Sequence, residues 1–209
     1  MSSVTMTDLR LTGSLSIKET GVSAQSRATI LTQDANAIFP INFALLRVWD
    51  AFQTNLPGTA ATDDLALVGG TFATAPPTIS GGDMKALGAT TRYARFQMQL
   101  PECYDAGQTI TLSMSAGMVT TVADTSCTLD VQCYKLDKAT GIGSDLCATA
   151  ATSINSLTFA DIPFTITPTG LVAGDVFDVR IAITCTDAAT GTAVTPTIAA
   201  IDLLCDIRG

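Results

Sequence analysis

The chain has 209 residues and a net charge of −8, and 47% of its residues are apolar against only 14% that are charged. This balance excludes an intrinsically disordered chain, which would be rich in charge and poor in apolar residues. The acidic net charge argues against nucleic-acid binding, which needs a basic surface. Histidine is absent, so Ser-His-Asp and Cys-His catalysis and histidine-ligated metals are excluded too.

Residues 1–37 are mostly polar, with a weak two-residue alternation between Leu9 and Ile17. We expect an extended N-terminal arm here, with one edge strand at most. The first twenty residues lack a basic region followed by an apolar run, so we expect no secretory signal peptide. No stretch of the chain approaches the ~20 apolar residues that a membrane helix needs, so we expect no membrane partner.

A single β-sandwich domain is predicted to span residues 38–209. It opens with an apolar run over residues 41–48, which we predict to be a strand, and we place the following Trp49 in the core. Residues 50–91 contain the turn-forming sequences NLPG, GG, APP and SGGD, with a short element at DDLALV. We predict a long irregular segment there, and such segments often form interaction surfaces.

From Arg92 onward, polar and apolar residues alternate with the period of a β-strand, first in RYARFQMQL. Further strands are expected in TITLSMSAGM, CTLDVQCYKL, SLTFADIPFTITP, DVFDVRIAITC and TIAAIDLLCDI. The 33 threonines favour strands as well, because threonine is β-branched. With the two earlier segments the count reaches about eight. We therefore predict an all-β fold, an antiparallel β-sandwich of jelly-roll-like form, without a helix longer than two turns.

All six cysteines are predicted to be free thiols. They are Cys103, Cys127, Cys133, Cys147, Cys185 and Cys205. Alternation places Cys127, Cys133, Cys185 and Cys205 on apolar strand faces, where cysteine acts as a small core residue. No two cysteines have CxxC spacing, so we expect no zinc site.

Aspartate dominates the acidic residues, with seventeen aspartates against two glutamates. Most lie beside glycine or threonine in turn-like stretches, where the side chain bonds nearby backbone amides. We predict structural turns, with no catalytic residue, no cofactor and no metal. Two alternatives stay open, a Ca²⁺ site and a carboxylate pair that hydrolyses glycosidic bonds.

The candidate interaction residues are Arg92, Tyr93, Arg95, Asp63 and Asp64. The first three form the only locally basic patch, in TTRYARF. They could pair with carboxylates of a neighbouring molecule or form a solvated strand face, and the sequence favours neither. The two aspartates lie in the irregular segment.

Three stretches, DDLALVGGTF, ATTRYARFQMQLPECYDAGQTITLSMSAGM and TVADTSCTLDVQCYKLDK, resemble β-rich virion proteins of tailed bacteriophages. TPTGLVAGDVFDVRIAI and the terminal LLCDIRG extend the resemblance over about residues 60–209. It implies a structural protein, of head decoration or minor capsid type, without catalytic residues.

This resemblance leads us to expect a non-enzymatic protein on the capsid exterior, assembled in the bacterial host cytoplasm. Its partners would be the major capsid protein and other copies of itself, with a trimer favoured by the threefold positions of icosahedral shells. The low charge agrees with this, because association then buries few charged groups. The alternative is a tail or fibre module that binds host-surface carbohydrate, and an aspartate-based hydrolase is a third hypothesis.

Overall fold

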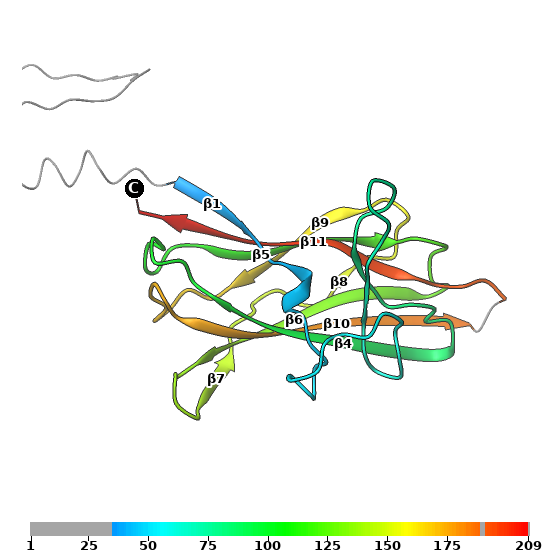
Figure 1. Cartoon of the computed structure of the whole chain (residues 1–209), viewed down its shortest axis with the longest axis horizontal. Helices are drawn as coiled ribbons and strands as arrows, with labels where there is room; N and C mark the ends of the chain where they lie inside the picture. Colours follow the sequence, from blue (N-terminus) through cyan, green and yellow to red (C-terminus); the bar gives the residue numbers. More distant parts are fainter. Residues whose placement is uncertain (1–34, 189–190, 209) are drawn as a thin grey trace, which may run out of the picture. The chain divides into compact units, whose positions relative to one another are not determined.

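Two antiparallel β-sheets face each other in the computed structural model, which describes residues 35–188 and 191–208 (Figure 1). Sheet A has the order β2-β3-β11-β5-β9, and β1 also pairs with β11. Its strands are β1 (Ala35–Pro40), β2 (Ala66–Val68), β3 (Thr78–Ser80), β5 (Ile110–Met118), β9 (Ala160–Ile166) and β11 (Pro196–Ile207). Sheet B has the order β4-β10-β6-β7, and β8 also pairs with β6. Its strands are β4 (Leu87–Gln99), β6 (Ser126–Leu136), β7 (Ile142–Asp145), β8 (Thr152–Ser153) and β10 (Val176–Ala188).

The predicted all-β fold is confirmed. Within the described ranges the only helix is the 3-10 turn η1 (Phe43–Leu45), and none is long and apolar enough to cross a membrane. The long strands β4, β5 and β6 alternate between the sheets, as do β9, β10 and β11, which is a jelly-roll type of connection. The described part of the chain holds eleven strands rather than about eight. Among those that periodicity did not reveal, β2, β3, β7 and β8 are too short to show alternation.

The predictions for the first 91 residues differ from the structure in several places, and one of them lies outside the described residues. The strand expected over residues 41–48 is wrong, because β1 ends at Pro40 and Asn42 caps η1 by accepting a hydrogen bond from the Ala44 N–H at 2.9 Å. The predicted irregular segment 50–91 contains β2 and β3, and β4 already begins within it. The alternating stretch between Leu9 and Ile17 lies outside the described residues, and the proposed boundary at residue 38 falls within β1.

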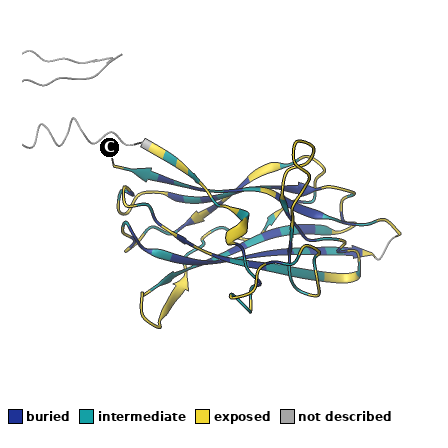
Figure 2. Cartoon of the chain, viewed as in Figure 1, coloured by how far each residue is buried: buried dark blue, intermediate teal, exposed yellow. Residues whose placement is uncertain are grey.

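The core lies between the inner faces of the two sheets, and buried residues follow the middle strands of both (Figure 2). β10 shows the reason most clearly, because Phe177, Val179, Ile181 and Ile183 are all fully buried on its inner face. Antiparallel pairing with β4 on one side and β6 on the other holds β10 along nearly its whole length. The outward residues of these three strands are therefore fixed in position.

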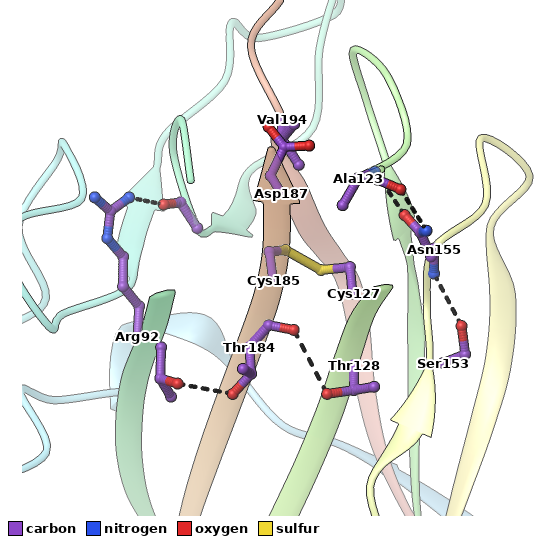
Figure 3. The surroundings of a disulfide bond; sticks show 12 residues. Arg92, Ala123, Cys127, Thr128, Ser153, Asn155, Thr184, Cys185, Asp187 and Val194 are labelled. Carbon is purple, nitrogen blue, oxygen red and sulfur yellow. Dashed lines mark hydrogen bonds between the residues drawn. A yellow bond between two sulfur atoms is a disulfide. The ribbon is translucent and has the colours of Figure 1, made fainter. Parts of the chain in front are cut away.

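Cys127 and Cys185 form a disulfide (Figure 3), so the prediction of six free thiols is wrong. The two residues are directly opposite each other in the β6–β10 register, with Cα atoms 4.1 Å apart. The sequence places both on apolar faces but does not reveal that those faces align residue for residue. Burial of Cys127, Cys133, Cys185 and Cys205 is confirmed.

We expect four reactive thiols, not six, when the unfolded protein is titrated without reductant, and six after reduction. In the native protein Cys103 should react first, because it is exposed. Cys205 should react slowly, because burial raises its pKa to about 11 and leaves almost no thiolate at neutral pH. Replacing Cys127 and Cys185 together by alanine should lower the free energy of unfolding by about 2–4 kcal/mol. Six thiols without reductant would contradict the disulfide.

Candidate functional site

The outer face of sheet B carries an ordered grid of polar side chains. In the register of β4, β10 and β6, Arg180 lies between Arg95 and Gln132. One row further along, Asp178 lies between Gln97 and Tyr134. These residues alternate with the buried residues of the same strands, so packing of the core turns all of them outward.

Two segments that precede β4 cover its otherwise free edge. Arg47 exchanges backbone hydrogen bonds with Arg95, at 2.7 and 3.0 Å. The chain at Asp63 accepts a bond from the Tyr93 N–H at 2.7 Å, and the Leu65 N–H donates to the Tyr93 carbonyl at 2.8 Å. These bonds satisfy backbone groups that an edge strand would leave open, and they bring Trp49 beside the outer face.

Trp49 is therefore not a core residue, and its predicted position is wrong. It is partly exposed, and its indole Nε1 donates a hydrogen bond to Asp63 Oδ2 at 3.1 Å. The rings of Trp49 and Tyr93 have centroids 5.0 Å apart and are tilted by 46°. The Arg180 guanidinium carbon lies 5.7 Å from the centroid of Trp49 and 5.1 Å from that of Tyr93, so both rings hold it by cation–π attraction.

Arg95 and Asp178 form the main ion pair of this face. Arg95 Nε donates to Asp178 Oδ1 at 2.7 Å, and Nη2 bonds Oδ2, so the pair is bidentate. Asp178 is buried, whereas Arg95 is partly exposed and also lies over the Phe52 ring at 5.1 Å. The hydrogen bonds to Asp178 raise the pKa of Arg95, against the effect of burial. Both charges are therefore neutralised within the protein.

These groups surround a shallow hollow of about 350 Å³ on the sheet face, which we call the sheet B hollow. Its lining residues are Trp49, Asp50, Arg95, Gln132, Tyr134, Ile142, Asp178 and Arg180. The side chains of Gln132 and Tyr134 make no hydrogen bond with any described residue, so their polar atoms are available to a ligand. A rigid sheet thus presents aromatic surface beside free donors and acceptors.

The structure separates the five candidate interaction residues into three groups. Tyr93 and Arg95 join the aromatic and charged cluster of the sheet B face, and Asp63 supports it through Trp49. Arg92 points the other way, where its Nη1 donates to the Gly81 and Asp83 carbonyls. Burial lowers the pKa of Arg92, while the charge of Asp83 opposes this. Asp64 pairs with β4 through its backbone.

Sequence reasoning missed Gln132, Tyr134, Asp178 and Arg180 as members of a site. One signal was present, because Asp178 and Arg180 are charged residues at alternate positions of an otherwise apolar strand. A metal centre has no support in residues 35–188 and 191–208, where no three cysteine or carboxylate side chains cluster to hold an ion. The expectation of a metal-free, cofactor-free protein stays a prediction.

No protein-family model matches the chain, and no curated protein matches it. Among solved structures, the chain is similar to the xylan-binding module CBM15, with 16% identity and a TM-score of 0.44 over 84% of this chain and all of that one. TmCBM61, solved in complex with beta-1,4-galactotriose, has 8% identity and a TM-score of 0.33 over 83% of this chain and 88% of that one. The enzymatically active domain of bacteriophage CBA120 tailspike protein 4 has 12% identity and a TM-score of 0.37, over 81% of this chain and 19% of that one. Similarities this distant assign neither a ligand nor a residue role.

Asp64→Asn should stabilise the protein slightly at pH 7. Burial, with the charges of Asp63 and Asp50, raises the pKa of Asp64, and its Oδ1 is buried without a partner among the described residues. A carboxylate with a raised folded pKa destabilises the fold above that pKa and ceases to do so when it is protonated. The gain in unfolding free energy, on the order of 0.5 kcal/mol after screening, should shrink as the pH falls towards 4. Chemical denaturation at pH 7 and pH 4 measures it, and a gain that grows at pH 4 would contradict this assignment.

Proposed function

We propose that this chain is a non-catalytic module that binds carbohydrate in the sheet B hollow. The observation that carries the proposal is the composition of that hollow, in which unpartnered polar side chains stand beside aromatic and aliphatic ones. Sugars present hydroxyl groups around the ring and C–H groups on its faces. A sugar-binding surface must therefore offer planar hydrogen-bonding groups and apolar contacts together.

Each requirement is met by particular side chains. Gln132 offers both a donor and an acceptor, and the Tyr134 hydroxyl does the same. The apolar contacts come from Trp49 on one side of the hollow and from Ile142, which is 57% exposed, at β7 on the other. Because Gln132 and Tyr134 lie on a central strand of sheet B, binding needs little ordering of the protein.

The arrangement of carboxylates favours binding over hydrolysis. Hydrolysis of a glycosidic bond uses two carboxyl groups, one of which gives a proton to the leaving group. The two carboxylates at the sheet B hollow are Asp50 and Asp178. Asp178 has both oxygens bonded to Arg95, so neither oxygen is free to meet the leaving group of a sugar.

A second candidate function is that of a structural protein, with a role in contacts between copies of the chain on a phage particle. The observation favouring it is a hollow of about 500 Å³ on the outer face of sheet A, the sheet A hollow, which is largely apolar. It is lined in part by Val68, Pro76, Val119, Phe159 and Ala199. Apolar surface of this kind often marks a protein–protein contact.

The β2–β3 connection strengthens that second candidate. Phe72 is fully exposed there, at a turn in which the Thr71 and Ala75 backbones exchange hydrogen bonds at 2.9 Å. Ala75 and the following Pro76 line the sheet A hollow, so Phe72 and the hollow belong to one surface region. A partner that covers this phenyl ring removes apolar surface from water, and this favours association.

Carbohydrate binding is tested first by a broad glycan array and then by calorimetry with the glycan that binds best. Gln132→Ala and Tyr134→Ala should each weaken binding at least fivefold, because they remove free polar groups without breaking an internal hydrogen bond. Thr111→Ala on the outer face of sheet A is the matched control and should bind like the wild type. Unchanged circular dichroism excludes misfolding as the cause. If the wild type bound no glycan, the proposal would be wrong.

The subunit-contact role predicts that the wild type self-associates and that Phe72→Ser weakens this association at least tenfold. Loss of one buried phenyl ring costs about 2 kcal/mol, which is more than a factor of ten in affinity. Sedimentation velocity over a range of concentrations measures the effect, with Leu157→Ser as a matched exposed apolar control. A wild type that stays monomeric at high concentration would remove self-assembly from the candidates.

A further inference from the structure

We propose that the sheet B hollow selects a carboxylate-bearing saccharide and that Arg180 is the residue that selects it. This inference rests on the carbohydrate-binding function proposed above and names the class of sugar. It follows from the difference between the two arginines at the hollow, Arg95 and Arg180, which lie opposite each other in the β4–β10 register.

The charge of Arg95 is already neutralised, because its guanidinium forms a bidentate pair with Asp178. Arg180 forms no ion pair with any residue of the described ranges, and its guanidinium lies over the rings of Trp49 and Tyr93. Arg180 is partly exposed and lines the hollow, so a ligand can reach its guanidinium. An anionic ligand group would supply the missing partner.

The aromatic contacts also prepare Arg180 for this role. Cation–π contact uses the flat face of the guanidinium, whereas the N–H groups lie in its plane and remain for an acceptor. The two rings restrict the long arginine side chain, so less conformational entropy is lost when a ligand binds. Planar bidentate acceptors match this donor, and a carboxylate is one of them.

The remaining groups distinguish an acidic sugar from a simple anion. Gln132, opposite Arg180 on β6, places an amide donor next to the cation. Asp50 is an exposed carboxylate that also lines the hollow. Its charge opposes the binding of any anion, and only a ligand that also carries hydroxyl groups can offset this by donating hydrogen bonds to Asp50. A ligand that satisfies Arg180 and Asp50 together therefore carries both a carboxylate and hydroxyl groups. Uronic acids and sialic acids have this combination.

The test compares matched glycans that differ only in the acidic group. One pair is trigalacturonic acid and its methyl ester, and the other is sialyllactose and its methyl ester. Calorimetry should give at least one acidic glycan a tenfold or greater advantage over its neutral counterpart, and the advantage should fall as NaCl is raised. Arg180→Gln should abolish the difference, while Arg180→Lys, which keeps the charge but not the planar fork, should retain part of it.

Arg208→Gln is the matched control, because it removes a cation that is paired with Asp105 outside the hollow. It should keep the full preference, and thermal unfolding of all variants checks that they fold. Equal affinity for acidic and neutral glycans, or a preference that survives Arg180→Gln, would overturn this inference. If the protein bound neutral glycans through Gln132 and Tyr134, the carbohydrate-binding proposal would stand without it. If it bound none of the four glycans and no glycan on the array, both would fall.

Discussion

The alternation of β10 is the constraint on which the rest of the structure depends. Its inward residues form the centre of the core, and its outward residues Asp178 and Arg180 lie in the sheet B hollow. A shift of one residue in its pairing would exchange the two faces and turn both charged side chains towards the core. Long pairing with β4 and β6 opposes such a shift, and the Cys127–Cys185 bridge fixes the register to β6 covalently.

The site forms because the chain before β4 returns to that strand's free edge. Backbone bonds to Tyr93 and Arg95 serve first to complete the edge, and the side chain of Trp49 comes with them. The hydrogen bonds that complete the β4 edge therefore also position side chains of the sheet B hollow. The two arginines of the hollow differ in their partners, since Arg95 pairs with buried Asp178 whereas Arg180 lies over the ring of Tyr93.

The two outer faces of the sandwich differ in chemistry. Sheet B presents aromatic rings with charged and amide groups, whereas the sheet A hollow is largely apolar and lies beside the exposed Phe72 turn. Binding of a sugar and contact between subunits would therefore use separate surfaces. A particle protein that binds a glycan with one face while packing through the other is consistent with both proposed functions.

The sequence by itself determined the fold class, because alternation in β4, β6, β10 and β11 is a local property that the core requires. It also determined which cysteines are buried. Only the tertiary structure decided that Cys127 faces Cys185 and that Trp49 meets Tyr93 and Arg180. These contacts join segments 58, 44 and more residues apart, and their partners depend on strand order and register, which periodicity along one strand does not encode. Arg92 shows both kinds of information. Alternation along β4 places Arg92 on the face opposite to Tyr93 and Arg95, but its hydrogen bond to the Gly81 carbonyl depends on the tertiary structure.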